Sequence, residues 1–276
     1  MPSDTGTATP TVRHATAPSR SQLIAHLTKT RITGDVATSR ENNLSHYRAL
    51  ADGDRYYWLG LELGDRWTKE ASVLAVMAER CGVVADPAHT HGQDTIGAGL
   101  CVDALDRMAA VLREAVERQA RVLFATGHPG GVFTVHRAVA QAMAEAGCTV
   151  LVTGDVPLPD GRQEVRLVDR VATLHQGGHL LHTHAAEPMQ AVLGRLEERG
   201  GPDALPRLVV ADHGWAGCAG QRGIETVGFA DCNDPALFLA EVEGTLRVTV
   251  PLDDNVSPRL YQPLTAYLLR EAGLDG

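Results

Sequence analysis

The chain has 276 residues, with 25 Lys and Arg against 34 Asp and Glu, and its formal net charge is −9 at pH 7. This acidic balance argues against a general nucleic-acid binder, because contacts to phosphate backbones require a basic surface. No apolar run reaches the roughly 18 residues of a membrane helix, and five cysteines without a C-x-x-C pair argue against a disulfide framework.

Residues 1–20 are rich in Ser, Thr, Ala and Pro and lack the apolar stretch of a secretory signal. We predict a disordered tail there and a cytoplasmic protein with neither a membrane nor a nucleic-acid partner. The pattern then becomes helical: Ser21 is a candidate cap for a first helix, and further helices are expected over about 68–81 and 102–119. Residues 21–120 are therefore interpreted as a helical layer.

From Arg121 onward, short apolar runs alternate with amphipathic helices. Strands are expected at 122–125, 149–153, 179–183, 208–211, 226–230 and 246–250, with 162–168 as an additional strand or edge hairpin. Helices are expected at 132–146, 188–199, 235–243 and 258–272. These elements predict a single α/β domain over residues 21–276, whose core, residues 121–276, is a doubly wound, mostly parallel, Rossmann-like sheet.

Polar residues follow the predicted strands at the points where the strands end. In strand order these are His128, Asp155, His182 with His184, Asp212 with His213, Asp231, and Asp253 to Asn255. Ligands bind outside the carboxyl ends of the strands in an open parallel sheet. We therefore expect these side chains to share one edge of the sheet and to form one site.

The glycine-rich segment 127–131 lies between a predicted strand and a predicted helix. Backbone N–H groups in such a loop can bind an anion, which makes Gly127, Gly130, Gly131 and the nearby Thr134 candidate phosphate-binding residues. The alternative is a tight turn in which glycine relieves crowding. The segment matches neither GxxxxGK[ST] nor GxGxxG, so it does not indicate ATP or dinucleotide binding.

Arg40 is a further phosphate-binding candidate, because its guanidinium can clamp an anion. The competing interpretation is that Ser39 caps a helix and that Arg40 is simply solvated.

Histidines are the candidate acids, bases and metal ligands. His128 and His213 can act as general acid or base, with Asp212 orienting His213 or itself serving in catalysis. The H-x-H pair His182 and His184 can hold a metal ion. Any one of these histidines can instead be a loop residue with an ordinary hydrogen bond.

Carboxylates supply the other candidate metal ligands. Asp212 and Asp231 directly end apolar strands, and carboxylates in that position are typical of Mg²⁺ or Mn²⁺ sites that face a phosphate. Asp234 is better interpreted as the helix cap before Pro235. Asp253 and Asp254 are equally compatible with a simple turn.

Three segments, VVADHGWAG at 209–217, VGFADCNDPALFLAEVEG at 227–244 and VPLDDNVSP at 250–258, resemble a small group of actinobacterial proteins catalogued as phosphatases. The likeness extends from about Ile32 to Leu269. It implies hydrolysis of a phosphate monoester. The chain does not contain the DxDx[TV] signature of haloacid dehalogenases.

The resulting hypothesis is a phosphatase that acts on a small phosphorylated metabolite with a divalent metal, Mg²⁺ or Mn²⁺ in preference to Zn²⁺. Two alternatives remain open. One is a phosphosugar-binding module without catalysis, and the other is a metal-dependent amidohydrolase or deacetylase that uses His182, His184 and His213. The residues also leave open whether the chain forms a homo-oligomer.

Overall fold

The computed structural model describes residues 17–275 and contains one large sheet. Its strands are β3 (Arg121–Thr126), β4 (Thr149–Val150), β5 (Val156–Pro157), β6 (Gln163–Val168), β7 (Val171–Gln176), β8 (His179–Leu181), β9 (Leu208–Asp212), β10 (Glu225–Ala230) and β11 (Val248–Pro251). Their spatial order is β11-β10-β9-β3-β7-β6-β5, with β4 beside β3 and β8 beside β7. The strands from β11 to β7 are parallel, and only β5, β6 and β8 are antiparallel to their neighbours. A mixed α/β fold around a mostly parallel sheet is thereby confirmed.

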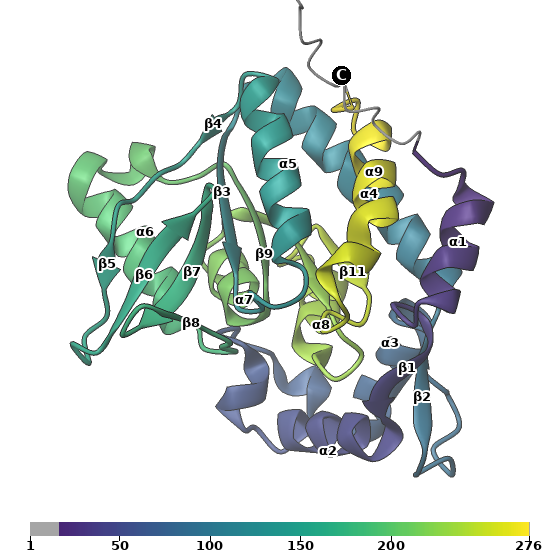
Figure 1. Ribbon diagram of the computed structural model, residues 1–276. Helices are drawn as coiled ribbons and strands as arrows, with labels where there is room; N and C mark the ends of the chain where they lie inside the picture. The colour runs from purple at the N-terminus through teal and green to yellow at the C-terminus, as the bar shows by residue number, and fades with distance from the viewer. Residues whose placement is uncertain (1–16, 276) are drawn as a thin grey trace, which may run out of the picture.

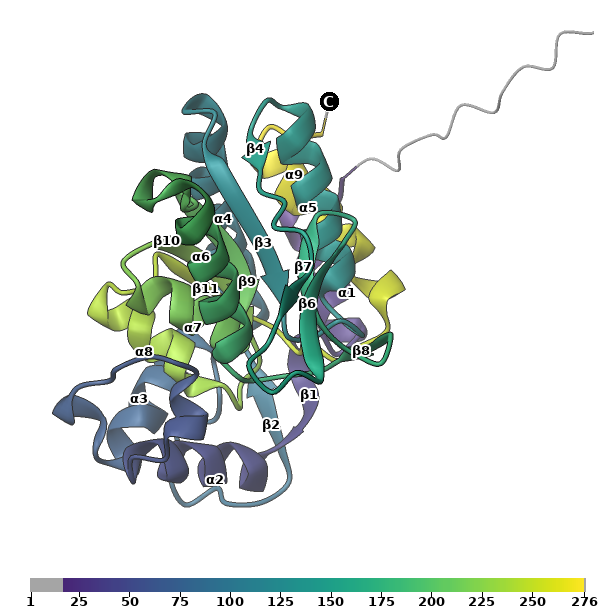
Figure 2. The ribbon, with the colours of Figure 1, turned by 90° about the vertical axis from the view of Figure 1, so that its left-hand side faces the viewer.

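Helices cover both faces of this sheet (Figures 1 and 2). One face is packed by α1 (Arg20–Lys29), α4 (Ala98–Glu117), α5 (Phe133–Glu145) and α9 (Gln262–Glu271). The other is packed by α6 (Glu187–Gly200), α7 (His213–Gln221) and α8 (Pro235–Glu243), while α2 (Arg40–Ala51) and α3 (Glu70–Arg80) pack on α8. Short 3-10 helices are η1 (Arg55–Trp58), η2 (Asp65–Trp67), η3 (Pro202–Ala204) and η4 (Pro258–Tyr261). Within residues 17–275, no helix combines the length and apolarity needed to cross a membrane.

Strand β3 shows why the sheet is buried on both sides. Val122 and Phe124 belong to the core with α4 and α5, whereas Leu123 and Ala125 belong to the core with α6 and α7, and all four are fully buried. Side chains alternate across a strand, so a strand with helices on both faces must be apolar throughout.

The order of the strands creates a switch point beside β3. The chain passes from β3 to β7 on one side and then returns to β9 on the other side. Loops that leave two such strands at their carboxyl ends diverge, and the crevice between them is where open α/β sheets bind ligands.

Residues 34–97 lie across the carboxyl ends of the central strands (Figure 1). Strands β1 (Gly34–Ser39) and β2 (Gln93–Ile96) form an antiparallel pair, and its register shifts between Asp35 and Ser39. That irregularity lets Thr38 reach Asp231 at the end of β10. The helical layer predicted over residues 21–120 is not confirmed as one layer. Helices α1 and α4 belong to one face of the sheet, whereas α2 and α3 lie across the strand ends, and two strands accompany them.

The N-terminal boundary differs from the predicted one. Helix α1 begins at Arg20, and its cap is Ser19, which forms a capping box with Gln22; Ser21 lies within the helix. Residues 1–16 of the predicted tail lie outside the described residues.

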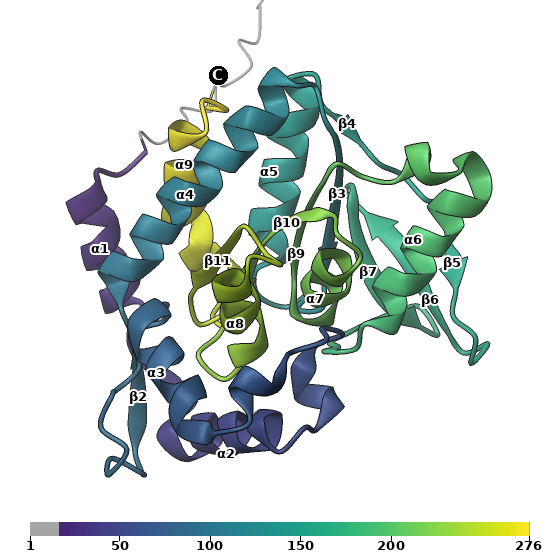
Figure 3. The same ribbon diagram turned by 180° about the vertical axis from the view of Figure 1, so that it is seen from behind.

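Helix α7 was not among the helices expected from the sequence, because its glycine-rich sequence is typical of a turn. Residues 213–220 are all buried, and the helix packs against β9 and β10 on one side and against the neighbouring loops on the other (Figure 3). A Cβ at Gly214 or Gly217 would overlap the carbonyl oxygens of His184 and Leu59. Glycine is used here for close backbone approach, and the tertiary contacts outweigh its poor helix propensity.

Two strand predictions also needed correction. Strand β4 is only two residues long and leaves the sheet at Val150, so Asp155 lies exposed near Arg166 and away from the other strand ends. Strand β7 was not predicted, and the predicted strand at 179–183 is β8, which runs antiparallel to β7. The alternation of apolar and polar residues does not by itself show where the hairpin between two neighbouring antiparallel strands, such as β7 and β8, lies.

Candidate active site

A pocket of about 360 Å³ lies at the carboxyl ends of β3, β9, β10 and β11. Its polar lining consists of His128, His182, His184, His213, Asp231, Asp234, Asp253, Asp254, Thr38, Ser39, Asn42, Asn233 and Asn255. The four carboxylates are all buried. No lysine or arginine is among the described residues that line the pocket. The structure therefore brings together eight of the predicted strand-end residues, namely His128, His182, His184, His213, Asp231, Asp253, Asp254 and Asn255.

His213 occupies the junction between β9 and α7 in a left-handed conformation with φ of 45°. Such a backbone costs a non-glycine residue roughly 1–3 kcal/mol and persists only where surrounding structure imposes it. Its Nδ1 lies 2.8 Å from Asp234 Oδ2, and its Nε2 lies 3.4 Å from Asp254 Oδ2. Burial alone would lower the pKa of His213, but Asp234, with Asp212 and Asp254, raises it to about 10.

His128 and His182 pack face to face, with ring centroids 4.6 Å apart. His128 Nδ1 lies 3.0 Å from Asp254 Oδ1, and although burial lowers the pKa of His128, this carboxylate raises it overall. Burial, followed by the neighbouring histidines, lowers the pKa of His182 to about 4. His182 is therefore a neutral imidazole near pH 7, with a free electron pair for a proton or a cation.

The H-x-H pair reaches the pocket by a route that differs from the predicted one. After the antiparallel β8, the chain crosses the end of β3, where Thr183 N donates to Gly127 O at 2.9 Å. This crossing places His182 and His184 on the pocket side, and His184 stacks on His213 with centroids 4.1 Å apart.

Asp234 faces the histidines and does not cap the following helix. No side-chain cap bond is present at the start of α8. The Asp234 carboxylate instead approaches His213 Nδ1 and lies 3.4 Å, through Oδ1, from His184 Nδ1. The expected Asp–His orienting pair is thus formed by Asp234 with His213, and Asp212 has another role.

Asp231, Asp253 and Asp254 form a carboxylate group at the ends of β10 and β11. Asp231 accepts hydrogen bonds from Thr38 Oγ1 and from the Cys232 backbone N–H, both at 2.6 Å. Burial first, and then the adjacent carboxylates, raises the pKa of Asp231 well above its usual value, and the pKa of Asp253 is also raised, chiefly by burial. Buried carboxylates this close repel one another unless a proton or a cation is shared between them.

Several buried polar atoms in the pocket lack a hydrogen-bond partner among the described residues. They are His128 Nδ1, His213 Nδ1 and Nε2, Asp234 Oδ2 and Asp254 Oδ2. Several lie within 3.4 Å of one another, yet the angles are not those of hydrogen bonds. Buried polar atoms are normally satisfied, so this convergence is the feature expected of ligands arranged around a cation.

Asp212 does not line the pocket. Its carboxylate accepts from the Gly127 N–H at 2.6 Å and from Thr126 Oγ1 at 2.5 Å, and it lies 3.2 Å from His136 Nε2. These contacts anchor the loop after β3 to the end of β9. His136 was not identified from the sequence, because a lone histidine inside an amphipathic helix carries no signal of its own.

We expect Asp212→Asn to lower the free energy of unfolding at neutral pH by roughly 3 kcal/mol, since it breaks a fully buried charged network. Burial opposes the ionised form, but His136 and then His213 and Thr126 lower the pKa of Asp212 to about 2. A carboxyl group whose pKa is lowered in the folded state stabilises the protein at pH values above its unfolded pKa of 3.8. This stabilisation is lost as the pH falls through about 2. Denaturant unfolding of the wild-type protein and the variant would be measured between pH 6 and 2. The difference between their free energies of unfolding should shrink in acid, and a constant difference would contradict this assignment.

Two of the three glycines predicted to bind phosphate, Gly127 and Gly131, have their N–H groups engaged within the protein, and the role of Gly130 stays a prediction. The Gly127 N–H donates to Asp212, the His128 N–H donates to Thr126 Oγ1, and the Gly131 N–H donates to His128 O. A Cβ at Gly127 would overlap Thr183 O, and one at Gly131 would overlap Asp254 O. These two glycines therefore serve close backbone packing. Thr134 is also outside the pocket lining, with its hydroxyl 3.5 Å from Pro258 O.

Arg40 is neither a phosphate clamp nor a solvated side chain. It is fully buried, its Nη1 lies 2.9 Å from Asp94 Oδ2, and its other donors bind the carbonyl oxygens of His89 and Asp86. The prediction that Ser39 caps the helix is confirmed, because Ser39 Oγ accepts from Asn42 N. Arg40 thus holds the loop before β2 against α2.

We expect Arg40→Met to lower the free energy of unfolding by about 3–5 kcal/mol, because it leaves the buried Asp94 without its cation. The KM for a phosphate ester, measured well below the melting transition, should stay within about threefold of the wild-type value, since this side chain does not line the pocket. A large rise in KM with unchanged stability would restore the phosphate-binding role.

Comparisons with known proteins agree with the pocket's composition. A family model described as Phosphatase matches residues 18–276. The chain is also similar to Phosphatase SCO2771 of Streptomyces coelicolor, with 61% identity over 262 residues that cover 93% of this chain and 97% of that protein. The resemblance to actinobacterial phosphatases is thereby confirmed, and the chain belongs to the Phosphatase family.

Proposed function

We propose that the protein hydrolyses a phosphate monoester of a small metabolite with the help of a divalent metal. The observation that carries this proposal is the charge of the pocket: four buried carboxylates line it, and no described lysine or arginine does. A phosphate dianion placed about 4 Å from one carboxylate is repelled by about 4 kcal/mol per charge pair at an effective dielectric of about 20. Phosphate binding in such a pocket therefore requires bound cations.

The available ligands suit a divalent metal. Carboxylate oxygens favour Mg²⁺ or Mn²⁺, and the imidazoles of His128, His182 and His213 also accept Mn²⁺ or Zn²⁺. A metal bound there would polarise the phosphoryl oxygens and lower the pKa of a water molecule. Asp231 keeps its predicted place among the ligands, whereas Asp212 has its carboxylate engaged elsewhere.

The protonation of the histidines is linked to the cation. Although burial lowers the pKa of His213 and of His128, the neighbouring carboxylates raise both values in the metal-free pocket. A cation bound by these imidazoles would take the place of their protons. His182, with its pKa near 4, is neutral and can serve as a ligand or a base. Asp212 acts as a positioning residue through the Gly127 N–H. The volume of about 360 Å³ suits a small metabolite.

The test begins with chelator-treated protein. Release of phosphate from p-nitrophenyl phosphate and from a panel of sugar phosphates would be measured before and after addition of Mg²⁺, Mn²⁺ or Zn²⁺. We expect little turnover without metal and recovery with Mn²⁺ or Mg²⁺. Inactivity with every metal would contradict the proposal. Tight phosphate binding without turnover would indicate a phosphosugar-binding module, and stoichiometric zinc with amide hydrolysis would indicate an amidohydrolase.

A further inference from the structure

Three groups of ligand-bearing side chains lie in the pocket, each with its ligand atoms within 4.8 Å of one another. Two of them share no residue: the imidazole group, which is His128, His182 and His213, and the carboxylate group, which is Asp231, Asp253 and Asp254. The third, His184, His213 and Asp234, shares His213 with the imidazole group. We propose that the pocket binds two divalent cations, one at the imidazole group and one at the carboxylate group, and that Asp254 lies between them and contacts both. The proposal rests on the proposed function only in that both require a cation.

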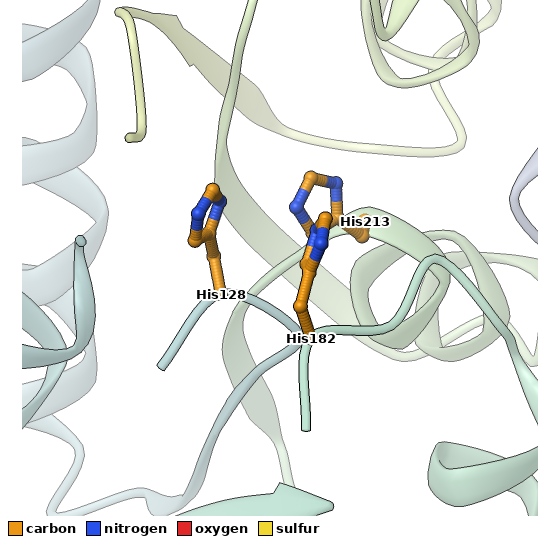
Figure 4. A group of neighbouring side chains, drawn as sticks. All are labelled: His128, His182 and His213. Carbon is orange, nitrogen blue, oxygen red and sulfur yellow. The ribbon is translucent and has the colours of Figure 1, made fainter. Parts of the chain in front are cut away.

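The imidazole group assembles from three separate segments of the chain. His128 follows β3, His182 follows β8 and His213 begins α7, and the three rings converge (Figure 4). Their centroids are separated by 4.6, 5.4 and 5.8 Å. His128 Nδ1 and His213 Nε2 are buried without a hydrogen-bond partner in the described chain. A cation would satisfy both atoms, and imidazole nitrogen is the ligand that Zn²⁺ and Mn²⁺ accept in proteins.

The carboxylate group is supported by donors that fix its orientation. Thr38 and the Cys232 N–H hold Asp231, while the N–H groups of Ala37 and Asn255 hold Asp253. All three carboxylates are at least nine-tenths buried. Three buried acids, two of them oriented by neutral donors, form an oxygen-only site of the type that Mg²⁺ or Mn²⁺ occupies.

Asp254 connects the two groups. Its Oδ1 lies 3.0 Å from His128 Nδ1, and its Oδ2 lies 3.4 Å from His213 Nε2, without hydrogen-bond angles in either case. Neighbouring ligands bound at about 2.1 Å around one cation are about 3.0–3.4 Å apart. The carboxylate therefore faces the imidazole group while it remains a member of the carboxylate group, which is the position of a bridging ligand.

Asp234 and His184 have a different place in this arrangement. Asp234 approaches His213 at Nδ1, the ring nitrogen that points away from Asp254, and it also contacts His184. A carboxylate on the second nitrogen of a ligating histidine sets the orientation of the ring and raises its basicity. Asp234 is accordingly a positioning residue for His213.

The experiment counts cations on the full-length protein. Chelator-treated protein would be dialysed against Mn²⁺ and its bound metal measured by elemental analysis, and electron paramagnetic resonance would show whether the ions are coupled. We expect two Mn²⁺ per chain with the spectrum of a coupled pair. One ion per chain, or two uncoupled ions, would overturn the proposal, and the wild-type measurement does not depend on the folding of any variant.

Two variants assign the ions to their groups. His182→Ala should retain one Mn²⁺, bound by carboxylates, and Asp253→Asn should retain one, bound by nitrogen ligands, which the hyperfine spectrum distinguishes. His175→Asn, a buried histidine on β7 outside the pocket, should retain both. Loss of the same ion in both pocket variants would overturn the two-site arrangement. One ion with metal-dependent phosphate release would contradict this inference alone, whereas no ion and no metal dependence would contradict the proposed function.

Discussion

Replacement of His213 by Asn is expected to lower kcat/KM for p-nitrophenyl phosphate by on the order of 10³, within the range found when a catalytic side chain is removed, because it takes away a ligand of the proposed cation. The imidazole stands between Asp234 and Asp254, so its loss leaves both buried carboxylates without their partner. Asn tolerates the left-handed backbone that this position requires, so the substitution leaves the turn between β9 and α7 in place. Because two buried carboxylates lose their partner, the free energy of unfolding should also fall, so kcat/KM would be measured well below the melting transition of the variant.

His175→Asn is the matched control for this substitution. It also removes a buried imidazole, but one that hydrogen-bonds Thr173 on β7 and does not line the pocket. Its kcat/KM should remain within about threefold of the wild-type value. Steady-state kinetics and thermal melts of both variants would check the expectation. Equal activity in the His213 variant and the control would remove His213 from the catalytic machinery.

Gly131→Ala is expected to reduce kcat/KM by about 10²-fold, because a displacement of about 1 Å at a catalytic group has an effect of that size. The added methyl would overlap the carbonyl oxygen of Asp254, and neighbouring atoms of Asp254 and Asn255 are also close. The segment after β11 must then move, and the Asp254 carboxylate moves with it. We also expect a loss of roughly 1–3 kcal/mol in the free energy of unfolding.

Gly130→Ala provides a control at the adjacent position. A Cβ there meets nothing within 4 Å, and Gly130 is not among the glycines with positive φ. The change should alter stability by less than about 0.5 kcal/mol and leave turnover within about twofold. If the two alanine variants behave alike, the close approach between Gly131 and Asp254 does not control the geometry of the pocket.

Local patterns were sufficient to predict most of the sheet core. Apolar runs that alternate with amphipathic helices predicted β3, β9, β10 and β11, together with the helices between them, because burial on both faces requires this periodicity. The same patterns predicted that the ends of those strands carry the polar residues. They failed at α7, because glycine is a turn signal in sequence and a packing residue in this buried helix.

The site could be predicted in part. Residues that directly end a parallel strand, such as His213 and Asp231, were identified because their position follows from the direction of the strand. Asp234 was assigned to a helix cap, because that role is common for an aspartate before proline, whereas Asp253 and Asp254 were left open between the site and a simple turn. Arg40 was misassigned because its partner Asp94 lies 54 positions away in the chain.

The sequence by itself determined the alternation of strands and helices, the acidic character of the chain and the edge of the sheet where polar residues collect. Only the tertiary structure decided which nitrogen of His213 faces which carboxylate, how the H-x-H segment enters by crossing β3, and why Gly127 and Gly131 admit no side chain. The reason is physical. Periodicity and capping depend on neighbours within a few positions, whereas these contacts join segments separated by whole crossovers, and their geometry depends on strand order and packing.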